Sequence, residues 1–247
     1  MFYHANLIQR VKHLEFHMTT KNILVIGASR GIGAELVQIF AKNAEHQVYA
    51  FSRNLTAMQK KFGAHINVHA FALDLVDAEM KQTFKAQINA ISSIDVLVYN
   101  AGYLVNKPFT ELSRSDIQKS YQINVMSAFE IIQAAIPKLA TKAHVVSISS
   151  MGGFQGTVKF TGLSAYSTSK AALVSLTELL AEEYKDKDWA FNCLALGAAQ
   201  TEMLEAAFPG YEAPVSASEM AEFIADFSLN ANRFIKGKVL PVSLSTP

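Results

Sequence analysis

The chain has one cysteine, Cys193, among 247 residues. A single cysteine forms no internal disulfide and gives no metal cluster, so we predict no metal site and a reducing, cytoplasmic compartment. Cys193 lies in an apolar run, which favours a packing role in the core over the alternative role of a nucleophile.

Charged residues are also scarce, at 17% of the chain, and the formal net charge is +1. This balance argues against a partner that is a nucleic acid or an acidic surface. No run of about twenty apolar residues occurs, so we expect no transmembrane helix and no membrane partner. Hydrophobic residues make up 50% of the chain, enough for a sizeable buried core.

Residues 1–19 lack the apolar middle and the cleavage site of a signal peptide. Leu7, Val11 and Leu14 recur at helical spacing and would suit a short amphipathic arm. A plain extension, with Met18 as the original start, is the alternative. We interpret this segment as an N-terminal extension and assign it no function.

Short apolar runs alternate with amphipathic segments from Asn22 onward. The runs are apolar on both faces, as in parallel strands that are covered on both sides, and regular alternation implies right-handed crossovers. We therefore predict an α/β fold of the Rossmann type, a doubly wound, mainly parallel seven-stranded sheet with helices on both faces. The predicted strands are 22–26, 47–52, 67–72, 95–99, 144–149, 190–196 and 238–242, and helical segments include 32–43, 78–90, 121–136 and 164–184.

No repeat and no linker rich in proline or glycine divides the chain, so we expect residues 20–247 to form one domain. The least regular segment, 202–218, contains Pro209, Gly210 and Pro214 and is predicted to lie outside the sheet. We interpret it as a mobile lid over the substrate. A fixed surface helix followed by a loop is the alternative.

A glycine-rich loop directly follows the first predicted strand and opens onto a helix. Its sequence, from Gly27 to Gly33, reads Gly-Ala-Ser-Arg-Gly-Ile-Gly. Glycines allow a tight turn close to a pyrophosphate, whose charge is met by the helix N-terminus. The position after the first strand favours nucleotide binding over an ordinary strand-to-helix turn.

The end of the second predicted strand indicates which dinucleotide binds. An NAD site has an acid there for the ribose hydroxyls, whereas this chain has Ser52 and Arg53. Arg30, in the glycine loop, could supply a second guanidinium to the 2′-phosphate. We therefore predict that NADP(H) is preferred over NAD(H), the alternative being that both arginines are solvated surface charges.

Tyr166 and Lys170 are four residues apart and therefore share one face of a predicted helix. An ammonium near the phenol would lower the tyrosine pKa and suit it for proton transfer to a carbonyl oxygen. Ser149 and Ser150 end the fifth predicted strand, where ligands of open α/β sheets bind. Asn124 lies in an apolar helical segment and would be satisfied by a water chain to the lysine or, alternatively, by a structural link to a neighbouring strand.

In this order, the motifs resemble those of the short-chain dehydrogenase/reductase family over residues 21–247. They are the glycine loop, Asp74, Asn100-Ala101-Gly102, Asn124, the serine pair and Tyr166-Ser-Thr-Ser-Lys170. The resemblance implies an oxidoreductase that acts on a carbonyl or alcohol with NAD(P). It also implies a homodimer or homotetramer.

The resemblance assigns the roles residue by residue. Tyr166 would be the general acid/base, Lys170 would lower its pKa and hold the nicotinamide ribose, Ser150 would orient the substrate oxygen, and Asn124 would support a proton relay. Asp74 would bind the adenine amino group, the alternative being an N-cap for the helix beginning near residue 78. The expected cofactor-binding residues are Gly27, Ser29, Arg30, Gly31, Ile32, Gly33, Ser52, Arg53, Asp74, Leu75, Asn100, Ala101, Gly102, Tyr166, Lys170, Gly197 and Thr201.

Four positions depart from the family pattern without removing a catalytic group. Ile26 and Tyr99 replace a threonine and an asparagine, and Leu196-Gly197 replaces Pro-Gly, a change expected to loosen the loop on the nicotinamide side. The C-terminal Asp-Gly-Gly is absent.

The predicted activity is reduction of a ketone or aldehyde by NADPH, with Tyr166 protonating the oxygen. The pocket candidates are Tyr103, Phe154, Phe160, Met203, Leu204 and Phe208, each of which could instead be ordinary core. This apolar set predicts a small, neutral, partly apolar substrate. Alcohol oxidation with the same residues, and a dinucleotide sensor without chemistry, are the alternatives.

Overall fold

The computed structural model describes residues 20–244. The predicted N-terminal extension, with Leu7, Val11, Leu14 and Met18, lies outside the described residues. Seven strands form one sheet in the order β3-β2-β1-β4-β5-β6-β7, and all six neighbouring pairs are parallel. The strands are β1 (Asn22–Ile26), β2 (Gln47–Ser52), β3 (Val68–Ala72), β4 (Ile94–Tyr99), β5 (Leu139–Ser150), β6 (Ala190–Leu196) and β7 (Val239–Val242).

The predicted fold class is thus confirmed, and the sheet is wholly rather than mainly parallel. The largest difference is β5, which begins at Leu139 instead of residue 144, because Leu139 pairs with Ile94 before an irregularity in the register. Its added residues include the exposed Thr141 and Lys142 and show no apolar pattern. β3 starts one residue late because the side-chain amide of Asn67 is hydrogen-bonded to three carbonyls of the preceding segment, 41–46.

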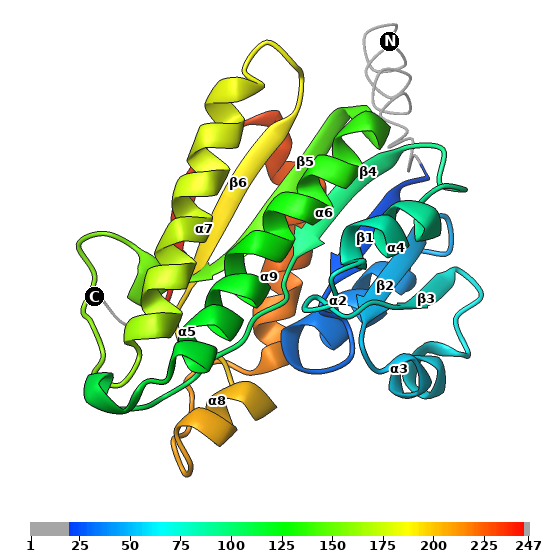
Figure 1. The fold of residues 1–247 in the computed structure, drawn as a ribbon. Coiled ribbons are helices and arrows are strands. Elements are labelled where there is room, and N and C mark those ends of the chain that lie inside the picture. Colours follow the sequence, from blue (N-terminus) through cyan, green and yellow to red (C-terminus); the bar gives the residue numbers. More distant parts are fainter. Residues whose placement is uncertain (1–19, 245–247) are drawn as a thin grey trace, which may run out of the picture.

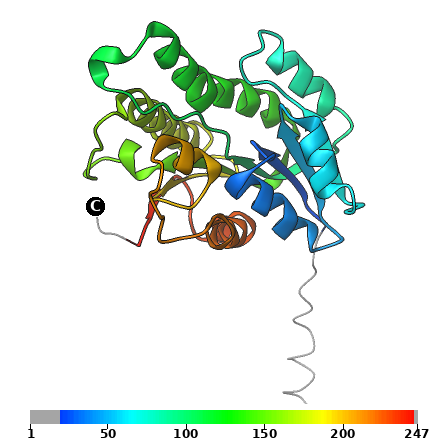
Figure 2. The same cartoon turned by 90° about the horizontal axis from the view of Figure 1, so that it is seen from below.

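Helices cover both faces of the sheet (Figures 1 and 2). α2 (Gly31–Ala41), α3 (Leu55–Phe62) and α9 (Ala217–Asn230) bury apolar side chains in one core cluster. α4 (Met80–Gln87), α6 (Ser127–Ala135) and α7 (Ser164–Glu183) bury theirs in a second cluster on the other face. The strands are buried on both sides for this reason, as in β1, where Ile23, Leu24 and Val25 are fully buried.

The predicted helix at 121–136 is part of a longer helical run. α5 (Arg114–Tyr121) is followed by a π-helical segment (Gln122–Met126) and then by α6. The π-helical segment contains Asn124 and is fastened by the Tyr99 hydroxyl, which donates to the Ile123 carbonyl at 2.5 Å. Tyr99 therefore has a defined bracing role.

A short helix, α8 (Glu202–Ala207), and a loop form the segment predicted to be a lid. It lies outside the sheet, as predicted, between β6 and α9. Cys193 is buried in β6, and burial raises the pKa of its thiol to about 12, which agrees with a packing role. No helix within residues 20–244 is long and apolar enough to cross a membrane.

Candidate active site

A cavity of about 680 Å³ lies at the carboxyl ends of the strands. Loops that follow each of the strands β1 to β6 contribute to its lining, together with α7. Nearly all the predicted site residues line it: Gly27, Ser29, Arg30, Gly31, Ile32, Ser52, Arg53, Asp74, Leu75, Asn100, Ala101, Gly102, Ser150, Tyr166, Lys170, Gly197 and Thr201. Gly33 and Asn124 are not among the lining residues.

The glycine loop needs its glycines for conformation and for close approach. Gly27 and Gly31 have φ angles of 89° and 52°, in the left-handed region that favours glycine. A Cβ on Gly33 would lie 2.0 Å from the Gly27 carbonyl oxygen, so only glycine lets α2 start this close to the turn. α2 has no side-chain N-cap and no acid in its first turn. Its N-terminal amides can therefore meet an anion in the cavity.

Positive charge lies at the same end of the cavity. Arg30 and Arg53 both line it, both are exposed, and within residues 20–244 neither guanidinium forms an ion pair. Asp74 lines the cavity too, and one of its carboxylate oxygens accepts from the Val76 amide at 3.2 Å. The alternative role of Asp74 as a helix N-cap is wrong, because α4 begins at Met80 and Glu79 occupies the cap position.

Lys170 is a buried cation beside the fifth strand. Its side chain reaches from α7 to the Ile148 carbonyl and donates to it at 2.7 Å. Burial lowers the pKa of Lys170 from its ordinary value of 10.5 to about 8, because an ammonium loses its hydration there. Its Nζ lies 6.0 Å from the centroid of the Tyr166 ring. The helical spacing thus brings the two side chains into one cluster.

Tyr166 differs from the expectation in the direction of its pKa. We expected the lysine to lower it, whereas burial raises it, and the hydrogen bond with the Ser150 side chain opposes that rise only in part. The reason is that the phenolate, like the ammonium, is disfavoured where water is excluded. An ordinary tyrosine is already protonated near neutral pH, so this rise leaves the phenol in its protonated form.

Both serines at the end of β5 line the cavity, but their hydroxyls have different partners. The Ser149 hydroxyl is buried and donates to the Lys170 carbonyl at 2.9 Å, so it fastens α7 to the sheet. Ser150 lines the cavity, accepts from the Gly152 amide at 3.3 Å and is hydrogen-bonded with Tyr166. The assignment of Ser150 as the substrate-facing hydroxyl stays a prediction.

Asn124 is fully buried and its amide braces the segment after β4. The side-chain oxygen accepts from the Tyr103 amide at 2.8 Å, while the side-chain nitrogen donates to the Tyr103 carbonyl at 2.9 Å and to the Ser169 hydroxyl at 2.8 Å. These bonds match the alternative of a structural link. Both its oxygen and the Lys170 ammonium come close to Gly102, where an added Cβ would lie 3.6 and 3.5 Å from them.

The loops at both ends of the cofactor site are fixed by backbone contacts. The Asn100 side chain donates to the Gly27 carbonyl at 2.9 Å and joins the loop after β4 to the glycine loop. With Ile26 in the usual threonine position, the amides of Gly27 and Ala28 both donate to the Phe51 carbonyl. Gly197 donates to the Val242 carbonyl at 2.8 Å and packs against Ser243, so this residue is held in place.

Of the six residues predicted for the substrate pocket, four line the cavity and two do not. Phe160, Met203, Leu204 and Phe208 line the cavity, but Tyr103 and Phe154 do not. The Tyr103 ring lies beneath the Lys119 ammonium, 4.6 Å away. Sequence reasoning missed further apolar lining residues, Leu104, Met151, Val158, Leu163 and Tyr211, since only their place after the strands could have indicated them.

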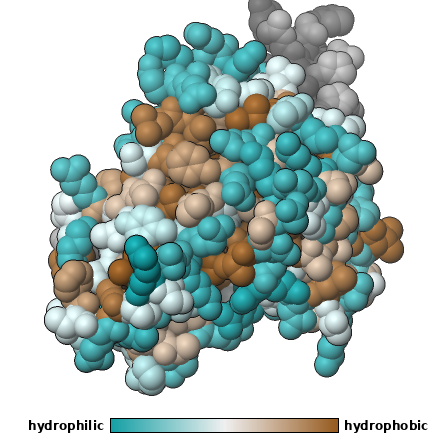
Figure 3. Space-filling model, viewed as in Figure 1, coloured by the Kyte–Doolittle hydropathy of each residue, from teal (hydrophilic) through white to brown (hydrophobic). Residues whose placement is uncertain are grey.

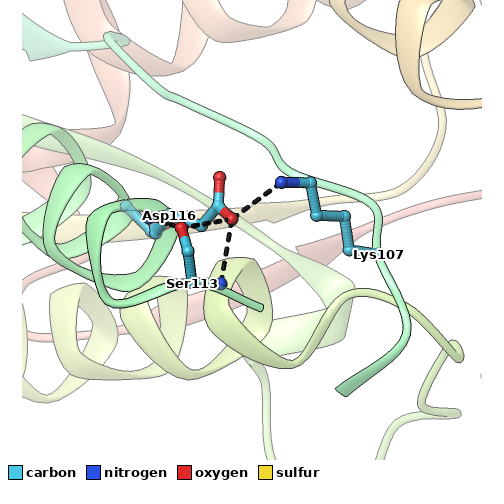
Figure 4. Close-up of polar contacts among 4 residues, drawn as sticks. Lys107, Ser113 and Asp116 are labelled. Carbon is cyan, nitrogen blue, oxygen red and sulfur yellow. Dashed lines mark hydrogen bonds and ion pairs between the residues drawn. The ribbon is translucent and has the colours of Figure 1, made fainter. Parts of the chain in front are cut away.

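Polar contacts connect the loop after β4 to the segments around the cavity. Figure 4 shows the Lys107 ammonium beside Asp116 at 2.8 Å, with Ser113 completing the N-terminal capping box of α5. The hydrogen bonds from Lys107 and Ser113 lower the pKa of Asp116 to about 2. The Lys107 amide also donates to the Gly162 carbonyl at 3.0 Å.

The segment with α8 is attached at two places. At its base, the Gln200 side chain accepts from the Ala213 amide at 2.8 Å, and Gln200 forms a β-bridge with Ser216. At its far end, the Asn106 side chain donates to the Ala207 carbonyl at 2.9 Å. The geometry fits a helix followed by a loop, set beside the substrate end of the cavity.

Comparisons with known proteins agree with this geometry. The family model described as short chain dehydrogenase matches residues 21–212. A 3-oxoacyl-[acyl-carrier-protein] reductase of Aquifex aeolicus is 29% identical over 199 residues, 77% of this chain and 78% of that protein. An L-2,3-butanediol dehydrogenase of Corynebacterium glutamicum is 36% identical over 137 residues, 54% of this chain and 52% of that protein.

A solved structure titled ElxO with NADP bound has a TM-score of 0.80 and 26% sequence identity, and the match covers 91% of this chain and 98% of that one. The family match spans most of the chain and includes the glycine loop and the Tyr166–Lys170 pair. The chain therefore belongs to the short-chain dehydrogenase/reductase family and is an NAD(P)-dependent oxidoreductase.

Proposed function

We propose that this protein reduces a ketone or aldehyde to an alcohol with NADPH, using Tyr166 as the general acid. The observation that carries the proposal is the cluster of Tyr166, Ser150 and Lys170 on the wall of a cavity whose other end is the glycine loop. One cavity can thus hold a dinucleotide and a carbonyl together.

The residues that line the cavity fit an extended dinucleotide. The uncapped N-terminus of α2 and the glycine loop suit the pyrophosphate, Asp74 and Asn100 suit the adenosine end, and Lys170 and Thr201 suit the nicotinamide end. When bound, the reduced nicotinamide supplies a hydride, and therefore two electrons, to the carbonyl carbon.

The protein's own groups manage the oxygen of the carbonyl. The Ser150 hydroxyl holds this oxygen beside the Tyr166 phenol, which gives it a proton as the carbon–oxygen double bond becomes an alcohol. The Lys170 ammonium then stabilises the phenolate until a proton from solvent replaces the one transferred.

Asn124 acts as a positioning residue in this scheme. Its amide holds the backbone of Tyr103 from both sides and so shapes the loop that borders Gly102 and Lys170. A relay of water between this region and Lys170 would return the proton to Tyr166. In this proposal the buried Asn124 amide positions the loop beside the relay and does not itself transfer the proton.

The preference for NADP(H) over NAD(H) is supported by the charges at the adenosine end. Arg30 and Arg53 line the cavity, and their guanidinium groups have no carboxylate partner among residues 20–244. A 2′-phosphate would give them one, because guanidinium groups bind phosphate with paired, charge-assisted hydrogen bonds. A bound NADP in a structure with 26% identity agrees with this preference.

Tyr166→Phe tests the proposed function directly. Removal of the hydroxyl should lower turnover of a carbonyl panel by about 100-fold or more, since the proton donor is lost, while NADPH binding measured by calorimetry is retained. Tyr184→Phe removes the same atom at the far end of α7 and should leave turnover unchanged. Near-wild-type activity of Tyr166→Phe at saturating substrate would refute the mechanism.

Two alternatives use the same fold. Alcohol oxidation would reverse the same proton transfer, with Tyr166 as the base. A sensor without chemistry would not require the Ser150, Tyr166 and Lys170 cluster, and the family is one of oxidoreductases. Comparison of initial rates with NADPH and carbonyls, and with NADP⁺ and alcohols, separates these readings.

We also propose a homodimer or homotetramer. Exposed apolar side chains lie along α5–α7: Ile117, Met126, Phe129 and Leu179. Figure 3 shows hydrophobic patches over these helices among hydrophilic surface. Such a surface gains from contact with a second copy, because its apolar area is removed from water. Sedimentation equilibrium gives the mass, and a monomer at micromolar concentration would exclude the proposal.

A further inference from the structure

The two ends of the cavity differ in charge. Its charged lining residues are Arg30, Arg53, Asp74, Lys170 and Glu202. Apart from Lys170, these belong to the glycine-loop end: Arg30 is in the loop, Arg53 and Asp74 follow β2 and β3, and a Glu202 oxygen lies near Gly31. In the sheet, β2 and β3 lie on one side of β1, and β5 and β6 lie on the other, although the segment after β6 reaches the glycine loop at Thr201 and Glu202.

The other end of the cavity extends from Tyr166 outward and is apolar. Two segments form it, one after β5 and one after β6. The nonpolar and aromatic lining side chains there are Met151, Val158, Phe160, Leu163, Met203, Leu204, Phe208 and Tyr211. A charged substrate group placed here would lose its hydration without a partner of opposite charge.

Three of these side chains form an exposed rim rather than a closed pocket. Val158 and Phe160 are each 56% exposed, and Tyr211 is 48% exposed, although all three line the cavity. The deeper residues Met151 and Leu163 are buried. The cavity is therefore apolar from the Tyr166 region out to its mouth.

Two charged side chains near the rim, Lys159 and Glu205, have partners elsewhere, whereas Glu212, next to Tyr211, is exposed. Lys159 lies between Val158 and Phe160, but its ammonium donates to the Phe154 carbonyl at 2.6 Å and to the Thr157 hydroxyl at 2.9 Å. Glu205 accepts from the Gly210 amide at 3.1 Å. The mouth thus keeps its apolar character despite charges close by in the sequence.

From this arrangement we infer that the substrate is an elongated neutral carbonyl compound whose apolar tail extends from Tyr166 to the rim of Val158, Phe160 and Tyr211. The inference rests on the proposed reductase function and deepens it. A small ketone would fill only the buried part. A longer tail would also cover rim side chains that are otherwise exposed to water, and each added methylene would be removed from water with them.

A homologous series of methyl ketones, from 2-butanone to 2-decanone, tests the inference with wild-type enzyme and NADPH. We expect kcat/KM to rise about threefold to fourfold per methylene, the factor typical of burying one such group, until the tail passes the rim. 9-Oxodecanoate has the same carbonyl and chain with a terminal carboxylate. Its kcat/KM should be about tenfold or more below that of 2-decanone.

Rim variants show where the tail lies. Phe160→Ser and, independently, Tyr211→Ser should each lower the ratio of kcat/KM for 2-decanone to that for 2-butanone by about fivefold or more. Phe234→Ser is the control, since Phe234 is 84% exposed and lies outside this cavity. It should leave the ratio unchanged. Circular dichroism confirms that the variants are folded.

The outcomes distinguish this inference from the proposed function. If both short and long ketones are reduced with equal kcat/KM, or if 9-oxodecanoate matches 2-decanone, the apolar-tail inference is overturned and the reductase function stands. A length dependence that neither rim variant alters would also overturn it. If wild-type enzyme reduces no carbonyl compound, the proposed function itself fails and the inference falls with it.

Discussion

Replacing Lys170 with methionine should make the folded protein respond differently to pH. The wild-type ammonium is only 3% exposed, and its pKa is lowered from 10.5 to about 8 by burial. At about 1.4 kcal/mol per pKa unit, keeping this group charged costs the fold about 3 kcal/mol near neutral pH. Methionine has a similar length and no charge, so the variant lacks this cost.

The sign follows from proton binding. Between pH 8 and 10.5 the unfolded chain keeps the lysine proton while the folded chain has released it, so wild-type stability rises with pH. Between pH 7 and about pH 9.5, the wild type should gain about 2 kcal/mol relative to Lys170→Met. The variant also loses the hydrogen bond to the Ile148 carbonyl. This loss lowers its free energy of unfolding by the same amount at both pH values, so it does not affect the change between them.

Urea unfolding of both proteins at the two pH values measures the difference. Equal m-values would show that the two unfolding transitions expose the same surface. Carbonyl reduction by the variant should be lost, because the cation near Tyr166 is gone. A stability difference that stays constant from pH 7 to pH 9.5 would refute the argument that Lys170 is held as a buried cation.

Three further predictions concern the cofactor end and the α8 segment. Arg53→Ala should weaken NADPH binding, measured by calorimetry, by about 10- to 100-fold and leave NADH binding as an internal control; equal affinities in the wild type would exclude the NADP preference. Gly33→Ala should lower both NADPH affinity and the urea midpoint, because its Cβ would meet the Gly27 carbonyl at 2.0 Å, and an unchanged midpoint would contradict this. Hydrogen exchange of amides 203–218 should slow by about tenfold or more with NADPH and a bound inhibitor, whereas equal rates would leave the segment a fixed helix and loop.

The sequence predicted the fold and brought together most of the residues that line the cavity, because these depend on local patterns. Strands that are apolar on both faces, such as β1, need only a window of a few residues to be identified. Glycine positions are equally local, since Gly27 and Gly31 require their φ angles wherever the loop lies. These features can be predicted without knowing which distant residues they contact.

The expectations that failed depended on contacts distant in sequence. The start of β5 is set by its pairing with Ile94, 45 residues earlier than Leu139, and no apolar pattern announces it. The side chain of Tyr103 points beneath Lys119 instead of into the cavity, which only the packing of α5 determines. The pKa of Tyr166 is raised because the depth of its burial, rather than its spacing from Lys170, has the larger effect.

The segment that contains α8 is attached differently at its two ends. Its base is closed by Gln200 with Ala213 and Ser216, and its far end is held by one side-chain bond from Asn106 to the Ala207 carbonyl. If this segment moves as the predicted lid, its opening would break the Asn106 hydrogen bond and leave the strand pairing of the sheet unchanged. In that case the rate at which ligands enter and leave would depend on the contact at residue 106, whereas the stability of the sheet would not.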